Sequence, residues 1–324
     1  MGRKSLLLLA LLILGLGGAY FWLQKPASVA VSRVPLLPSL QGRLAEVSAV
    51  EVDSPEQTPV RLERREQTWV VPAKAGYPAS VGAVNTLLRA LGEAQKAEAK
   101  TSNPQLHERL GLAERGEQRA TRINLELPGA PPLALLVGKP AQQGSGQLVR
   151  LVGDNQVWLI DKPINLPVEE LQWLDRRVAA IPFASVKRLE VRYADGQRLT
   201  LLRAEADEPN FRLAQLPAGK PLPYEAAANG MVNLFGRLDF ADAAPLTQVQ
   251  FKAPALLNFV LESFADGQVQ GAVYVQGEQY WLTLKERRNF SAEELPGKAD
   301  WAYRIEPGQY QALAKTLKDV LAKK

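Results

Sequence analysis

The sequence SLLLLALLILGLGGAYFWL occupies residues 5–23 and contains no charged side chain. Arg3 and Lys4 precede it, and an aromatic run closes it. A helix that rises about 1.5 Å per residue would carry this stretch across most of a hydrocarbon core about 30 Å thick. Backbone groups have no water partners in that core, so a helix is the state we expect. The sequence therefore predicts one transmembrane helix over residues 5–24, followed by a soluble body.

The two basic residues predict the orientation of this helix, because positive charge collects on the cytoplasmic side of membrane helices. Residues 1–4 would then be cytoplasmic, and the body would lie in the periplasm of a bacterium as part of a single-pass inner-membrane protein. A cleaved signal peptide is the alternative, since Gly17 and Ala19 are small enough for a cleavage site. Under both interpretations the body is exported.

Residues 25–43 contain three prolines and no clear hydrophobic period, which is typical of an extended spacer. The pattern then changes to short alternating strands. Ser80 is placed to cap a helix whose apolar side chains, such as Val84 and Leu87, fall on one face. We expect this helix to extend to about Ala99. A hairpin is expected around Gly153-Asp154-Asn155.

The same order of elements begins again after residue 184. Asp195-Gly196 and Asp266-Gly267 are strong hairpin signals. Helices are expected over Tyr224–Leu238 and Glu306–Leu321. The sequence therefore predicts an α+β fold: an N-terminal transmembrane helix followed by two related sheet-plus-helix units, residues 44–183 and 184–324. A chance likeness between two mixed halves is the alternative to duplication.

Composition excludes several classes of function. The formal net charge is +5, and the charges are interspersed along the chain. No basic stripe alternates with aromatic residues, so we expect no nucleic-acid partner. The chain has no cysteine, which removes disulfides, thiol nucleophiles, cysteine metal sites and lipoprotein attachment.

The sequence predicts no catalytic or metal-binding group. His107 is the only histidine, and its polar surroundings in the sequence favour an exposed residue with no role. A zinc site needs several nitrogen or sulfur ligands, which one histidine cannot supply. The pairs Glu169-Glu170 and Glu293-Glu294 are better explained as solvated helix starts, since neighbours on a helix point to different sides. We therefore predict no catalytic, cofactor-binding or metal-binding residues.

Three groups of short motifs resemble those of a known family. They are Leu110-Gly111-Leu112; Leu136-Val137-Gly138 followed by Gln147–Arg150 and Val157–Ile160; and Leu171–Arg177 leading to Ile181-Pro182-Phe183. The chain from Leu44 to Leu321 resembles a bacterial family of unknown function that is anchored by one N-terminal helix. Genes of this family often neighbour ABC transporters of the gliding-motility (Gld) type. The family's glycine turn usually carries an aromatic residue where this chain has Leu110.

The resemblance implies an accessory subunit in the cell envelope, with an ABC-type transporter as partner. Because no catalytic set is predicted, we expect this subunit to be non-enzymatic, and residues 5–24 would bind it to the inner membrane. The candidate docking group is Trp173 with Asp175, Arg176 and Arg177, at the predicted boundary between the two units. A salt-bridge cluster at a helix end is its alternative interpretation.

A second functional hypothesis is a periplasmic module that binds glycan or lipid. It predicts a groove lined by aromatic residues such as Trp158, Trp173 and Trp281. An envelope hydrolase is the third hypothesis, and the sequence offers it no convergent acid–base group.

Overall fold

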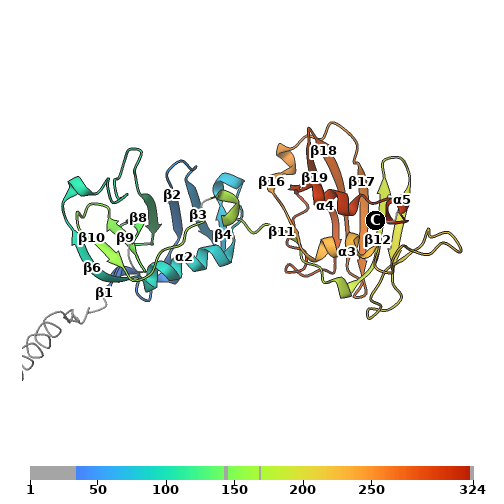
Figure 1. Cartoon of the computed structure of the whole chain (residues 1–324), viewed down its shortest axis with the longest axis horizontal. Helices are drawn as coiled ribbons and strands as arrows, with labels where there is room; N and C mark the ends of the chain where they lie inside the picture. Colours follow the sequence, from blue (N-terminus) through green and yellow to red (C-terminus); the bar gives the residue numbers. More distant parts are fainter. Residues whose placement is uncertain (1–33, 142–144, 168, 322–324) are drawn as a thin grey trace, which may run out of the picture. The chain divides into compact units, whose positions relative to one another are not determined.

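The computed structural model describes residues 34–141, 145–167 and 169–321 (Figure 1). Antiparallel sheets dominate this α+β fold, and helices are few. The helices are α2 (Val81–Glu93), α3 (Asn229–Asn233), α4 (Pro307–Leu313) and α5 (Leu317–Leu321). Two compact units can be distinguished. Among the described residues, unit 1 comprises 34–44, Arg89–Ala120 and the described part of Leu135–Ile164, and unit 2 comprises Ala45–Leu88, Thr121–Ala134 and the described part of 165–321.

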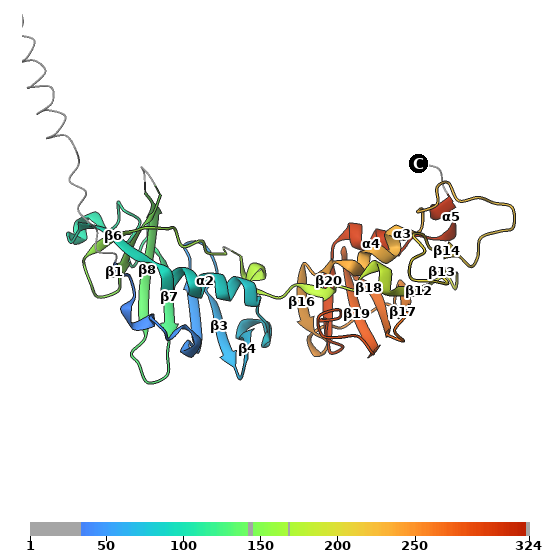
Figure 2. The same cartoon turned by 90° about the horizontal axis from the view of Figure 1, so that it is seen from below.

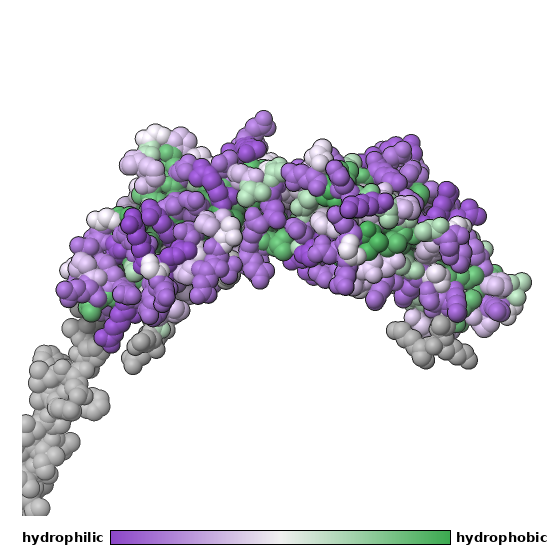
Figure 3. All heavy atoms as spheres, turned by 90° about the horizontal axis from the view of Figure 1, so that it is seen from above, coloured by the Kyte–Doolittle hydropathy of each residue, from purple (hydrophilic) through white to green (hydrophobic). Residues whose placement is uncertain are grey.

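The predicted transmembrane helix over residues 5–24 lies outside the described residues, as does the first part of the predicted spacer. Within the described ranges, every helix is too short or too polar to cross a bilayer. Hydrophilic side chains cover most of the face drawn in Figure 3, with smaller apolar areas between them.

Unit 1 is built on antiparallel strands that lie side by side in the sheet in the order β1-β6-β10-β9-β8. These strands are β1 (Val34–Pro35), β6 (Gln95–Thr101), β10 (Val157–Ile160), β9 (Gln147–Leu151) and β8 (Leu133–Pro140). The predicted hairpin around Gly153-Asp154-Asn155 is confirmed, because it joins β9 to β10 with Trp158 opposite Val149. A small apolar core of Leu112, Ala120, Leu136 and Val157 packs against this part of the chain.

Unit 2 contains a first run of antiparallel strands in the order β7-β2-β3-β4-β5. They are β7 (Thr121–Glu126), β2 (Ala49–Asp53), β3 (Val60–Arg65), β4 (Thr68–Val71) and β5 (Tyr77–Pro78). Helix α2 lies across these strands (Figure 2) and buries Val84, Leu87 and Leu88. The predicted cap is confirmed, since the Ala83 amide donates to Ser80 Oγ at 3.3 Å.

Unit 2 also contains an eight-stranded antiparallel sheet in the order β14-β13-β12-β17-β18-β19-β20-β16. The strands are β12 (Val186–Tyr193), β13 (Arg198–Leu202), β14 (Arg212–Leu213), β16 (Asp242–Pro245), β17 (Leu257–Ser263), β18 (Gln268–Gln276), β19 (Gln279–Arg288) and β20 (Trp301–Ile305). Both predicted aspartate–glycine hairpins are confirmed, joining β12 to β13 and β17 to β18. Figure 2 shows α3 and α4 along one face of this sheet, and a short ladder pairs β11 (Arg177–Ala179) with β15 (Leu238–Asp239).

Three predicted helices are shorter in the structure. The helix after Ser80 ends at Glu93, because the next residues pair as β6 with β10 and Asp161 accepts the Gln95 amide at 2.9 Å. Pairing with other strands outweighs the helical preference of a segment rich in alanine, lysine and glutamate.

The other two predicted helices are each divided into two shorter elements in the structure. In place of Tyr224–Leu238 there is α3 and a 3-10 turn over Leu234–Gly236. In place of Glu306–Leu321 there are α4 and α5, separated where the Thr316 hydroxyl and the Asp319 carboxylate form a hydrogen bond of 2.8 Å. The unit boundary between residues 183 and 184, and the duplication, stay predictions.

Candidate functional site

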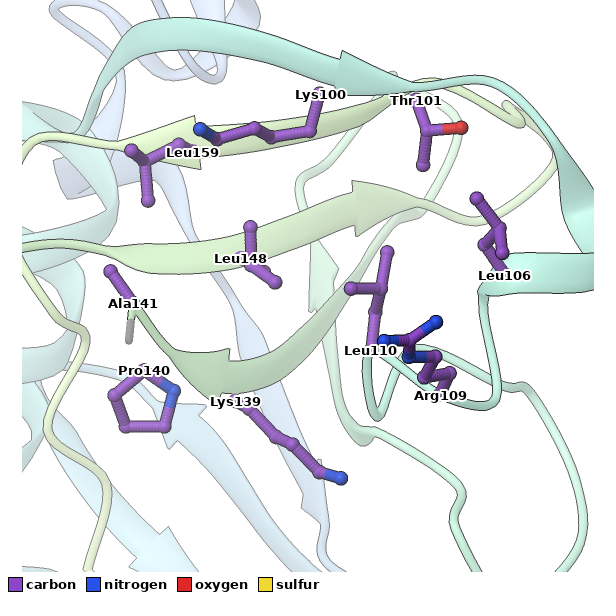
Figure 4. Close-up of a pocket in the computed structure, with 10 residues that line it drawn as sticks. All are labelled: Lys100, Thr101, Leu106, Arg109, Leu110, Lys139, Pro140, Ala141, Leu148 and Leu159. Carbon is purple, nitrogen blue, oxygen red and sulfur yellow. The ribbon is translucent and has the colours of Figure 1, made fainter. Parts of the chain in front are cut away.

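A hollow with a volume of about 630 Å³ is lined by residues of unit 1. This size falls within the range of about 300–1,000 Å³ that is usual for small-molecule sites. Its walls come from the end of β6, the turn before Gly111, the end of β8, and the middle of β9 and β10 (Figure 4). The lining residues are Lys100, Thr101, Leu106, Arg109, Leu110, Lys139, Pro140, Ala141, Leu148 and Leu159.

One wall depends on a turn that packs closely against β8. Gly111 has φ +68°, a left-handed conformation that favours glycine, and the Leu112 amide closes the turn on the His107 carbonyl oxygen at 2.7 Å. The Lys139 amide donates to the Leu110 carbonyl oxygen at 3.3 Å. A β-carbon on Gly138 would lie 2.8 Å from Leu112 Cγ, so only glycine permits this approach.

A buried arginine fastens the same turn to β9. Arg150 is only 4% exposed, and its guanidinium donates to the Leu112 carbonyl oxygen at 3.2 Å and to the Asp154 carbonyl oxygen at 3.0 Å. It also pairs with the Glu114 carboxylate at 3.1 Å. Removing the Glu114 carboxylate would leave the buried Arg150 charge with carbonyl partners only, so Arg150 is a positioning residue for this wall.

The prediction for His107 was wrong. This side chain is 6% exposed, and its Nε2 lies 3.1 Å from the carbonyl oxygen of Asn155 in the β9–β10 connection. The polar residues around it in the sequence gave no sign of this long-range contact. His107 therefore joins the turn to the hairpin, and it does not line the pocket.

The floor of the pocket is apolar and only partly covered. Leu110 and Leu148 are half-buried and pack against the small core of unit 1. Leu159 is half-buried, and Leu106 is 38% exposed. A ligand that covered this exposed apolar surface would gain about 0.8 kcal/mol of transfer free energy for each methylene group buried. The floor is therefore suited to a hydrocarbon group.

The rim is basic. Figure 4 shows Lys100, Arg109 and Lys139 on different sides of Leu148. Lys100 Nζ forms an ion pair with Glu98 at 2.6 Å. In the described ranges Arg109 and Lys139 form no ion pair, and both are exposed. None of the described lining residues carries a carboxylate, so the charged side chains among them are all basic and can bind an anion.

The structure places the predicted docking residues elsewhere, in unit 2. Trp173 is fully buried, and its carbonyl oxygen accepts the Ser80 amide at 2.7 Å. Arg176 Nε donates to the Phe240 carbonyl oxygen at 2.7 Å. Arg177 is exposed, and its guanidinium donates two hydrogen bonds of 2.9 and 2.7 Å to the Asp175 carboxylate. The hydrogen bond from Arg177 to Asp175 raises the arginine's pKa above its ordinary value.

The predicted aromatic groove loses one of its rings, because Trp173 is enclosed in the core. Trp158 is half-buried on β10 in unit 1, where Lys96 Nζ lies 4.5 Å from its ring centroid. Trp281 is half-buried on β19 in unit 2. The described residues also contain no group of three or more histidines and carboxylates that could hold a metal ion.

Sequence reasoning missed the pocket, although the motifs behind the family resemblance surround it. Leu110-Gly111-Leu112 and Gly138 form one wall, and Leu148 and Leu159 belong to the floor. The basic residues Lys100, Arg109 and Lys139 belong to no motif and carried no signal. The one usable sign in the sequence was the position of Gly111 and Gly138 within those motifs.

One of three comparisons with known proteins identifies a domain of unknown function in this chain. A search of curated proteins and a search of solved structures each returned no match. The family model described as a domain of unknown function, DUF4340, matches residues 69–258, which is more than half of the chain. The chain therefore belongs to the DUF4340 family.

Proposed function

We propose that this chain is a non-catalytic accessory subunit of an inner-membrane complex, held at the bilayer by residues 5–24 with its body in the periplasm. The observation that carries the proposal is the pocket of unit 1, which combines leucines with basic side chains. The uncharged run over residues 5–23 supports the tether. The resemblance to proteins encoded beside Gld-type transporters supports an ABC-type transporter as the partner.

Binding is favoured over hydrolysis by the chemistry of the pocket. Glycosidases place two carboxyl groups about 5–10 Å apart around the bond that they cut. The described lining of this pocket offers lysine, arginine and threonine as its polar side chains. Such groups can hold an anionic ligand in place, and this is the work of a binding subunit.

Arg177 is the most suitable residue of the docking group for contact with a partner protein. Trp173 is enclosed, and Arg176 is tied to the backbone of Phe240. Arg177 is exposed, and its pair with Asp175 lies at the surface. Exposed ion pairs contribute only about 0–1 kcal/mol to folding, so Arg177 can be replaced with little effect on the fold.

Purification of the tagged full-length chain from its native membranes in mild detergent tests the proposal. We expect subunits of a membrane transporter to be recovered with it, as identified by mass spectrometry. Arg177→Gln should reduce that recovery, whereas Arg198→Gln, an equal charge change at an exposed position of β13, should not. Repeated preparations without any membrane partner would contradict the proposal.

A further inference from the structure

The pocket of unit 1 presents two kinds of surface that one ligand could satisfy together. Leu106, Leu110, Leu148 and Leu159 form an incompletely covered apolar floor, and Arg109 and Lys139 are basic groups without an ion pair in the described part of the chain. We propose that this pocket binds an anionic lipid, with an acyl chain on the leucines and the headgroup held by Arg109 and Lys139.

The leucines of the pocket are unusually accessible to solvent. Leu106 is one of only four large apolar side chains in the described ranges that are classed as exposed. It stands beside three half-buried leucines instead of standing alone. Isolated surface leucines need no explanation, but a group of leucines within a hollow of about 630 Å³ is typical of a ligand site.

The basic side chains of the pocket lack a complete set of acidic partners among the described residues. Lys100 is already paired with Glu98, and none of the described lining residues is acidic. Arg109 and Lys139 therefore line the hollow without an acidic partner among the described residues. A guanidinium matches the oxygens of a phosphate in a two-pronged geometry, and a lysine adds a point charge. An anionic phosphate headgroup supplies the charge complement of this rim.

A peptide is a poorer occupant than a lipid, because peptides bind sheets by adding a strand to a free edge. The floor lies on β9 and β10, and each has a strand paired on both sides. Their backbone donors and acceptors are consequently engaged within the sheet. On the floor itself only side-chain contacts remain, and these suit a flexible hydrocarbon chain.

The position of the pocket along the chain also favours a lipid. The described residues begin with β1, where Val34 pairs with Lys96 near the start of β6. Lys100 and Thr101 at the other end of β6 line the pocket, about 15 Å away at the usual rise of a strand. The short strand β1, which follows the predicted membrane anchor in the sequence, thus pairs with a strand whose other end lines the pocket.

Titration of decyl phosphate into the full-length chain tests this proposal, with the chain held in phosphatidylcholine nanodiscs and the signal of empty discs subtracted. We expect saturable binding at one site. Decyl phosphocholine has the same chain without net charge and should bind about tenfold more weakly. Inorganic phosphate lacks the chain and should give no measurable binding.

Two matched pairs of variants locate the site. Arg109→Gln with Lys139→Gln should weaken decyl phosphate binding about tenfold, whereas Arg198→Gln with Lys220→Gln removes equal charge from exposed positions of unit 2 and should leave it unchanged. Leu106→Asp should abolish binding, and Leu106→Met should preserve it. Leu106 is exposed enough for both to fold, and circular dichroism would verify this.

Three results would overturn the proposal. Equal affinity in every variant would mean partition into the disc. Equal affinity for decyl phosphocholine would leave an apolar groove without headgroup selection. Tight binding of inorganic phosphate alone would indicate a phosphate site. The proposal rests on the proposed function only for the nearness of a bilayer, so recovery of a transporter could fail while lipid binding is retained.

Discussion

Gly138 and Leu112 approach each other so closely that a β-carbon on residue 138 would lie 2.8 Å from Leu112 Cγ. The same β-carbon would lie 2.9 Å from the carbonyl oxygen of Leu110, and backbone cannot move aside as a flexible side chain can. The turn that walls the pocket is therefore seated on β8 through a position that accepts only glycine.

Substitution Gly138→Ala should lower the free energy of unfolding by about 1–3 kcal/mol, the usual effect of forcing a methyl group into packed structure. Urea unfolding followed by circular dichroism would measure it. Gly308→Ala is the matched control, because nothing lies within 4 Å of a β-carbon there and the residue is in α4. Equal stability of the Gly138 variant and the wild type would contradict the close packing of this turn.

Arg203 should be the arginine of unit 2 that is least tolerant of lysine. It is 3% exposed, and its guanidinium lies 4.6 Å from the ring centroid of Phe211. Its nitrogens donate to the carbonyl oxygens of Phe183, Ala184, Val186, Ala206 and Glu208. A lysine has three donors and no planar fork, so several of these oxygens would be left without a partner.

We expect Arg203→Lys to lower the free energy of unfolding by about 2–4 kcal/mol. Arg198→Lys, at the exposed first position of β13, the strand that ends just before Arg203, should change it by less than about 0.5 kcal/mol. Thermal unfolding of the two variants side by side would decide, and indistinguishable midpoints would show that Arg203 does not secure these loops.

Two buried tyrosines of unit 2 should make stability fall at alkaline pH. Burial raises the pKa of Tyr303 to about 12 and raises that of Tyr77 well above its ordinary value. In the unfolded chain both would lose their protons near pH 10. Above that pH the native state binds more protons than the unfolded state, so the free energy of unfolding decreases as pH rises.

Each of the two tyrosines should remove about 1.4 kcal/mol per pH unit above about pH 10, with no contribution below it. For Tyr303 the loss continues up to its native pKa of about 12. Tyr77→Phe should remove one of the two contributions and flatten the decline. Urea midpoints measured at several alkaline pH values would test this, and an unchanged slope in the variant would refute it.

Local signals predicted much of the fold. Asp195-Gly196 and Asp266-Gly267 specify tight turns through backbone conformations that few other residues adopt, and both turns occur. Ser80 caps the start of α2 through another local interaction, the hydrogen bond from the Ala83 amide to its side-chain oxygen. The end of that helix could not be read, because the strand after it is fixed by pairing with β10, which lies more than fifty residues away.

The candidate site was hidden for a similar reason. Arg109 and Lys139 come together only because the turn after Leu106 packs onto the end of β8. Nothing near either residue in the sequence distinguishes it from other exposed basic residues. His107 was misjudged because its partner, Asn155, belongs to a distant hairpin. Sequence patterns report local conformation, whereas this pocket depends on contacts between remote segments.

The occupant of the pocket in living cells is the most direct test of the account. A photoreactive benzoylphenylalanine at Leu106 would crosslink whatever lies on the leucine floor, and the same group at Tyr224, which is 48% exposed in unit 2, is the control. We predict an intact-mass increase equal to an anionic lipid at position 106 only, reduced by Arg109→Gln with Lys139→Gln. A protein adduct at position 106, or the same adducts at both positions, would contradict the account.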